Sequence, residues 1–169
     1  MTISVRALTI AAATVLLATA AQAQAVKGAG FSAVFPCRSK LTTQNLAAGK
    51  DIIPVASYDC QSGGAVFYVV TSTYPKGFIA KKTLAGAFKD AVGGAAANVM
   101  GVVKSDTPIR LGKVPGHDVL IDVPTKKAAV HLRVFFVGDV QFQVMVVGAK
   151  GAETSKPVMD FMGSFRLGT

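Results

Sequence analysis

From residue 30 onward, hydrophobic residues mostly recur at every second position, which is the spacing of a half-buried β-strand. A proline at position 54 predicts that its run is an edge strand or begins irregularly. Residues 65–75 are apolar on both alternating faces, which predicts a central strand covered on both sides. Gly138-Asp139 between two strongly alternating runs is the clearest hairpin signal. The predicted strands are residues 31–36, 41–50, 51–60, 65–75, 102–112, 117–124, 128–137 and 140–149.

The hydrophobic period changes to steps of three and four in two segments, and this predicts two helices. The first spans residues 83–100, with an apolar face made by Leu84, Phe88, Val92, Ala95 and Val99. Its three glycines weaken it, so we expect packing against the sheet to hold it, and we assign the Gly-rich piece VGGAAA to helix packing. A membrane-surface helix is the alternative, but the face is small, alanine-rich and without a basic side.

The second helix is predicted to start at Thr154 or Ser155, with Pro157 in its first turn. Its expected buried stripe is Val158, Phe161, Met162 and Phe165. The order strands, helix, strands, helix, with hairpin connections, predicts an α+β fold in which an antiparallel β-sheet is flanked by helices. No internal repeat or long linker divides residues 26–169, so we expect a single globular domain there.

The first residues resemble a cleavable secretory signal peptide. Arg6 precedes an apolar run of about 14 residues and then Ala21-Gln22-Ala23, a small-residue cleavage pattern. A membrane anchor is the alternative, but the run is short of the roughly 20 residues that a spanning helix needs. We therefore expect cleavage after residue 23, or after residue 25 where the pattern repeats, and no membrane span in the mature chain. The predicted localisation is export, to the periplasm in a Gram-negative source and otherwise to the medium.

The charge of the chain gives no support to a nucleic-acid-binding function. The whole chain carries +9, and removing Arg6 with the leader leaves +8. The excess is dispersed, because the only adjacent basic pairs are Lys81-Lys82 and Lys126-Lys127. No aromatic-plus-basic motif of a nucleic-acid reader is present. The four lysines are a candidate surface for an anionic partner, and solubility is the alternative explanation for them.

Cys37 and Cys60 are the only cysteines, and in an exported protein the simplest interpretation is one disulfide. Two free buried thiols remain an alternative. A nucleophilic cysteine would need a neighbouring base, and a zinc site would need four ligands at recognisable spacing. Neither pattern appears around His117 or His131.

Catalytic, cofactor and metal motifs are not recognisable in the sequence. No Gly-x-Ser-x-Gly elbow occurs, and the glycine-rich pieces lack the context of a phosphate loop. We expect His117 to be a partly exposed imidazole beside a turn. We expect His131, which shares a strand face with Arg133, to lie on the solvent side or at a sheet edge. No cofactor is predicted.

Several phrases resemble the exported bacterial relatives of PsbP, the extrinsic protein of photosystem II. They are GFSAVFP, YVVTSTYP, LGKVPGHDVLID, VFFVGDVQFQVMVVG and FMGSFRL, and the resemblance covers about residues 30–167. It implies an α/β/α sandwich around an antiparallel sheet, a fold shared with a nuclear-transport factor for the Ran GTPase. No stretch is recognisable as the photosystem-binding amino-terminal extension, and the cysteine pair departs from the pattern, so no photosynthetic role is implied.

Proteins of that type act mostly as binding or assembly factors, so the leading hypothesis is an exported non-enzymatic module that binds a protein or another anionic partner. One alternative is an exported hydrolase whose site is assembled from distant residues, with turnover sensitive to substitution of His117 or His131. Another is a small-ligand or lipid carrier that uses the helix–sheet interface.

Overall fold

A computed structural model describes residues 23–168. The predicted leader therefore lies almost wholly outside the described residues. Strands account for 56% of the structure, and they form two antiparallel sheets. In chain order the elements are β1 (Gln24–Gly28), β2 (Phe31–Phe35), β3 (Lys40–Ala48), β4 (Asp51–Ser62), β5 (Ala65–Thr73), α1 (Leu84–Asn98), β6 (Val102–Leu111), β7 (Val114–Val123), η1 (Pro124–Lys126), β8 (Ala128–Val137), β9 (Val140–Ala149), η2 (Ala152–Thr154), α2 (Lys156–Ser164) and β10 (Arg166–Leu167).

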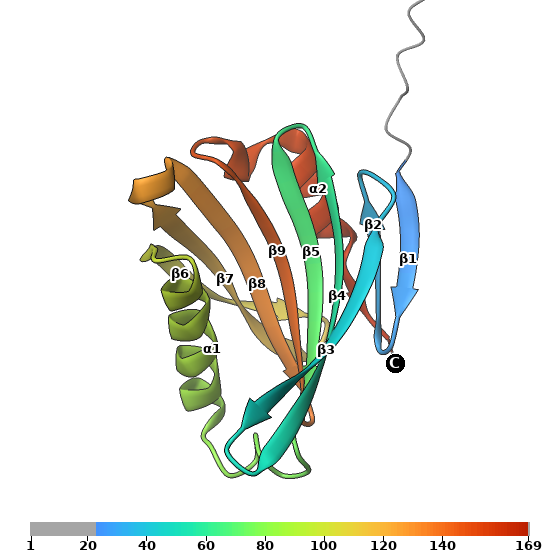
Figure 1. Ribbon diagram of the computed structural model, residues 1–169, viewed down its shortest axis with the longest axis vertical. Helices are drawn as coiled ribbons and strands as arrows, with labels where there is room; N and C mark the ends of the chain where they lie inside the picture. Colours follow the sequence, from blue (N-terminus) through green and yellow to red (C-terminus); the bar gives the residue numbers. More distant parts are fainter. Residues whose placement is uncertain (1–22, 169) are drawn as a thin grey trace, which may run out of the picture.

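The large sheet has seven strands in the order β3-β4-β5-β9-β8-β7-β6 (Figure 1). Five of its six neighbouring pairs are hairpins between consecutive strands. The sixth joins β5 to β9, with Val66 opposite Val147 and Thr73 opposite Val140. The predicted hairpin at Gly138-Asp139 is confirmed, since Val137 pairs with Val140 and Gly138 adopts a φ of 57°.

A different layer packs on each face of the large sheet. Helix α1 buries Phe88 and Val92 against the inner residues of β7 and β8, such as Val119 and Leu132. The opposite face is covered by α2 together with the small sheet β1-β2-β10 (Figure 1). Aromatic rings fill that second core, including Phe35, Phe67, Phe161 and Phe165.

The predicted fold class, an α/β/α sandwich of PsbP type with helices flanking one sheet, is wrong. The protein is mostly β, with ten strands in two sheets and only two α-helices among residues 23–168. Two strands that the sequence does not predict, β1 and β10, pair with β2 and form the small sheet, with Arg166 opposite Ser32. For the strands that it does predict, alternation does not indicate which sheet each one joins.

Two strand predictions also need correction. β4 is an interior strand between β3 and β5, although it contains Pro54. The proline is tolerated because the pairing with β5 begins only at Val55, so Pro54 has a single neighbouring strand. β5 is central as predicted, but its side chains are fully buried on one face only, at Ala65, Phe67, Val69 and Thr71.

Both predicted helices are confirmed, but two glycines of α1 do not have the packing role that the sequence predicts. Thr83 caps the helix by accepting a hydrogen bond from the Gly86 amide at 3.1 Å. Gly93 and Gly94 have no heavy atom within 4 Å of the position that a Cβ would occupy. Helix packing therefore does not explain them, contrary to the prediction. Neither described helix is long and apolar enough to pass through a lipid bilayer.

Candidate functional site

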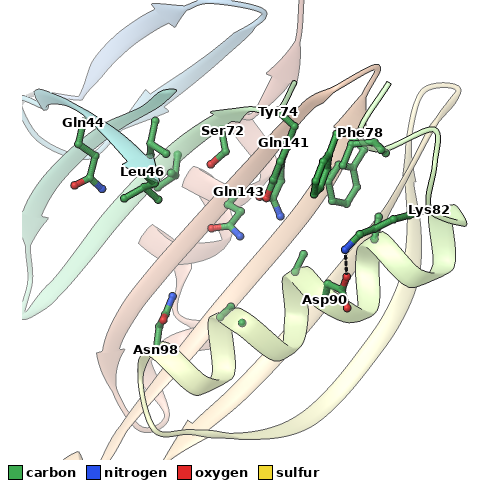
Figure 2. A pocket seen from close by; sticks show the side chains of 18 residues that line it. Gln44, Leu46, Ser72, Tyr74, Phe78, Lys82, Asp90, Asn98, Gln141 and Gln143 are labelled. Atoms are coloured by element: carbon green, nitrogen blue, oxygen red, sulfur yellow. Dashed lines mark hydrogen bonds and ion pairs between the residues drawn. The ribbon is translucent and has the colours of Figure 1, made fainter. Parts of the chain in front are cut away.

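On its face of the large sheet, α1 packs over β7 and β8 and leaves part of β3, β4, β5 and β9 uncovered. A groove runs between α1 and these four strands. We call it the α1 groove, and its volume is about 430 Å³. The second face of β5 contributes Val70 and Ser72 to it, and β9 contributes Gln141 and Gln143 (Figure 2). The remaining lining residues are Gln44, Leu46, Val55, Tyr74, Phe78, Ile79, Lys82, Ala87, Asp90, Ala91, Gly94, Ala95, Asn98 and Phe136.

Small residues of α1 keep the groove open. Ala87, Ala91, Gly94 and Ala95 contribute to its helix-side wall, and a Cβ added at Gly94 would have no heavy atom within 4 Å outside the backbone of α1. A larger residue at Gly94 would therefore start without a clash at its Cβ, on the side of α1 that lines the groove. Gly93, its neighbour, is exposed and does not line the groove. The pair thus provides one groove position and one matched control position.

The floor of the groove combines apolar groups with side-chain amides. Gln141 is only 5% exposed, and its Oε1 accepts a hydrogen bond from the Tyr74 hydroxyl at 3.2 Å. Burial raises the pKa of Tyr74, Lys82 opposes this increase and Asp90 adds to it. The phenol therefore stays protonated at neutral pH and can donate to Gln141. Gln44, Gln143 and Asn98 add three further amides, each able to donate and accept.

One end of the groove is closed by the loop between β5 and α1. In that loop Phe78 stacks on Tyr74, with ring centroids 5.2 Å apart and planes within 9° of parallel. The loop is fixed by Asp139, whose carboxylate accepts hydrogen bonds from the Gly77 amide at 2.7 Å and the Ile79 amide at 3.1 Å. The hairpin between β8 and β9 therefore positions the aromatic end of the groove.

Charge in the groove is confined to one ion pair. Lys82 binds Asp90 at this same end (Figure 2), and its Nζ lies 5.4 Å from the centroid of the Phe78 ring. The rest of the lining is uncharged. The α1 groove thus suits an occupant that is largely neutral and offers both hydrogen-bonding and apolar groups.

The four lysines predicted as an anionic-partner surface do not come together. Lys81 and Lys82 precede α1, while Lys126 and Lys127 lie at η1 and the start of β8, at the other end of the molecule (Figure 1). All four residues are exposed. Lys127 lies near a further lysine, since its carbonyl accepts a hydrogen bond from the Lys150 amide at 3.1 Å. The structure therefore presents two separate basic pairs.

A second polar cluster lies on the opposite face of the sheet, beneath α2. Asp118 accepts hydrogen bonds from His131 Nε2 at 2.8 Å and from Arg133 Nε at 2.6 Å. Burial works to raise the pKa of Asp118, but the hydrogen bonds and charges of His131 and Arg133 outweigh it and lower that pKa below its usual value. Arg133 also donates to the Met162 carbonyl at 3.0 Å, so the cluster attaches α2 to the sheet.

The expectation that His131 lies on the solvent side or at a sheet edge is wrong. The residue is 5% exposed on the interior strand β8. Its Nδ1 lies 3.1 Å from the Glu153 carbonyl oxygen, which can only accept a hydrogen bond. With Nε2 bound to the Asp118 carboxylate, both ring nitrogens are engaged in structural contacts.

His117 is partly exposed, as predicted, with 22% of its side chain accessible. Its Nδ1 binds Asp106, and its ring lies against Phe88 with centroids 4.2 Å apart. In residues 23–168, no serine, threonine or cysteine side chain hydrogen-bonds to either imidazole. The same residues contain no group of three or more His, Cys, Asp or Glu side chains that could hold a metal ion.

Asp122, near this cluster, is the one buried carboxylate with an unpaired oxygen in the described part of the chain. Its Oδ2 accepts a hydrogen bond from Lys150 at 3.2 Å and lies 3.9 Å from Lys104, while its Oδ1 has no partner. The adjoining hollow is only about 90 Å³. It can hold water, but it is too small for an organic ligand.

The predicted disulfide between Cys37 and Cys60 is present, and no cysteine is free. It connects the segment after β2 to β4, and so links the small sheet to the large one. A disulfide is compatible with an exported protein.

Sequence reasoning missed the residues of the α1 groove. The signal was present in β9, where Gln141 and Gln143 occupy one face of a strand whose other face is apolar. Two amides on one face of a central strand indicate a surface that is not fully packed. The contributions of β3 and α1 to the groove could not be predicted, because they depend on the tertiary arrangement.

Comparison with known proteins adds no assignment. No protein-family model matches this sequence, and no curated protein matches it. The resemblance to PsbP relatives therefore remains a prediction from the sequence.

Proposed function

We propose that this protein is an exported, non-enzymatic binding module that holds a segment of a partner protein in the α1 groove. The observation that carries the proposal is the second face of β5. This face is apolar at Val66, Tyr68 and Val70, yet α1 leaves all three only partly buried, and Val70 lines the groove together with Ser72. The Cys37–Cys60 disulfide supports an oxidising compartment, which is the periplasm if the source is Gram-negative.

A protein segment fits the chemistry of the groove. Peptide groups present a donor and an acceptor at each residue, and the amides of Gln44, Gln141, Gln143 and Asn98 offer the same two functions. The apolar floor and the ring of Phe78 can take hydrophobic side chains of the segment. Because the groove is almost uncharged, we expect this binding to depend little on salt.

The test uses two variants of α1. Gly94→Leu places a side chain in the groove, while Gly93→Leu adds the same side chain outside the groove. Tagged wild-type protein and both variants are incubated with the exported fraction of the source at low and high salt, and retained proteins are identified by mass spectrometry. A partner held by wild type and Gly93→Leu, but lost with Gly94→Leu, supports the proposal.

Other outcomes separate the alternatives. A partner that Gly94→Leu retains does not bind in the groove. If that partner is also lost at high salt, the exposed pairs Lys81-Lys82 and Lys126-Lys127 become the binding surface, and their substitution by glutamine tests this.

A small-ligand carrier is the second candidate, because the closed aromatic end at Tyr74 and Phe78 gives the groove the size and character of a ligand site. Native mass spectrometry of the purified wild-type protein and of Gly94→Leu tests it. A bound small molecule present only in the wild type would replace the protein segment as occupant.

A further inference from the structure

The two edges of the large sheet differ in how they are protected. Free sheet edges can pair with another strand, and proteins commonly block them with charges, prolines and bulges. The β6 edge has all three devices, namely Lys104 with Asp106 and Arg110, Pro108, and a register shift between Val103 and Ser105. Strand addition at β6 is therefore discouraged.

The β3 edge has no proline and no bulge, and its only charge is Lys40 at its first position. Its nine residues pair with β4 without a register shift, and Leu41 to Ala48 contain no charged residue and no proline. All nine residues are exposed, and within residues 23–168 no strand pairs with the outer side of β3. Three large apolar side chains are also exposed on this hairpin, namely Leu41 at 50%, Leu46 at 46% and Ile52 at 63%.

We propose that β3 pairs antiparallel with β3 of a second copy of this chain, so that the two large sheets become one continuous sheet. Full overlap of Lys40–Ala48 with itself places the two-fold axis at the middle residue, Gln44. Gln44 then lies opposite Gln44 of the second copy. Since residue pairs in such a ladder lie on the same face, the α1 grooves of both copies open on the same side of the joined sheet.

Charge supports this register. Lys40 lies opposite Ala48 of the second copy, and the two Lys40 side chains are held at opposite ends of the ladder. Ala48 is paired within its own chain with Asp51, on the same face. The small alanine therefore lets each lysine approach a carboxylate of the other copy, and the contact occurs twice by symmetry.

Apolar contacts on the other face support the same register. Leu41 lies opposite Ala47 of the second copy, and Ala47 is paired in its own chain with Ile52. Leu41 can therefore pack across the alanine against Ile52 of the other copy. The pairing thereby covers Leu41 and Ile52, two of the three large apolar side chains that the single chain leaves exposed on this hairpin.

The experiment measures the mass of the purified full chain after leader removal, by light scattering and sedimentation over a range of concentrations. Gln44→Lys and Gln44→Glu each set two like charges opposite one another at the two-fold axis, and Ser105→Lys adds the same charge at the β6 edge as the control. We expect a dimer for wild type and Ser105→Lys, and a monomer for each Gln44 variant alone. An equimolar mixture of Gln44→Lys and Gln44→Glu should restore the dimer.

A wild type that stays monomeric at the highest soluble concentration overturns the proposal, as does a dimer that both Gln44 variants retain. Failure of the mixture to dimerise overturns the register through Gln44. Circular dichroism shows whether each variant is folded, and the exposure of Gln44 makes unfolding of the single chain an unexpected result. No binding partner enters the measurement, so its outcome is independent of the function proposed for the α1 groove.

Discussion

Asp118 joins three parts of the protein through one carboxylate. It binds His131 and Arg133 of β8, and these two residues bind η2 and α2 through backbone carbonyls. Replacing the carboxylate would leave two donors of a partly buried cluster without their acceptor. Removing one partner of a buried pair lowers stability, because the remaining charged group has lost its hydration and no longer has a partner to compensate for it.

We therefore expect Asp118→Asn to lower the free energy of unfolding by about 2–3 kcal/mol at neutral pH. Urea unfolding followed by circular dichroism measures this change. Asp160→Asn is the control, since Asp160 pairs with Lys156 in an ion pair whose carboxylate is 62% exposed, and such pairs contribute little. Equal effects of the two substitutions would contradict the structural role of Asp118.

The lowered pKa of Asp118 also predicts a pH dependence. A carboxyl whose pKa is lower in the folded than in the unfolded protein stabilises the fold above the unfolded pKa, and this stabilisation is lost as pH falls through the folded pKa. Wild-type stability should thus fall below about pH 4, where unfolded Asp begins to protonate. Unfolding curves of Asp118→Asn should show a shallower decrease over that range. An equal decrease in the stability of wild type and Asp118→Asn would show that other titrating groups cause the loss of stability at low pH.

At the scale of elements, the glycines of α1 and of β7 have opposite roles. Gly93 and Gly94 lie in a helix interior with open space where a Cβ would be, so they weaken α1 without aiding its packing. In β7 the Cβ of an alanine at Gly116 would lie 2.4 Å from the Phe135 ring and 2.8 Å from the Val134 carbonyl oxygen. Gly116 is therefore required by close contact between strands and core.

Alanine substitution should separate these roles. We expect Gly93→Ala and Gly94→Ala each to raise the free energy of unfolding by about 0.5–1 kcal/mol, because alanine favours the helix. Gly116→Ala should lower it by about 1–3 kcal/mol through overpacking. Thermal and urea unfolding of the three variants measure the differences. Destabilisation by Gly93→Ala would mean that α1 has a contact the structure lacks.

At the scale of the whole molecule, the Cys37–Cys60 disulfide holds two sheets together. The small sheet is also attached to the large one by side-chain packing around Phe31 and Phe35, by the short connection from β2 to β3, and by the Ser39 amide, which donates to Gln24 Oε1 at 2.7 Å. A crosslink between residues 23 positions apart also restricts the unfolded chain.

Replacing both cysteines by serine should therefore lower the free energy of unfolding by about 3 kcal/mol. Urea unfolding of the oxidised wild type and the double variant measures it, and reduced wild type is the matched control. Intact mass with alkylation of the denatured protein should show no reactive thiol before reduction. Two alkylated cysteines without reduction would contradict the disulfide.

Most of the local elements follow from the amino-acid sequence alone. Alternation located the strands β2 to β9 but not β1 or β10, a change of period located both helices, Gly138-Asp139 located a hairpin, and two lone cysteines indicated the disulfide. These features depend on neighbouring residues, because backbone preferences and side-chain period act over a few positions. For the same reason the predicted fold class failed: the pairing of β10 with β2 joins residues far apart in the chain, and nothing in either segment specifies it.

Which face of each strand is covered depends instead on how segments distant in the chain pack together. The apolar second face of β5 predicted burial, yet α1 packs over β7 and β8 and leaves β5 to line a groove. The buried position of His131 follows likewise from α2 and η2 lying over β8. Two helices cannot cover both faces of a seven-stranded sheet completely, so some apolar strand faces stay partly exposed. The sequence pattern of such a strand is the same whether a helix of the protein or another molecule covers it.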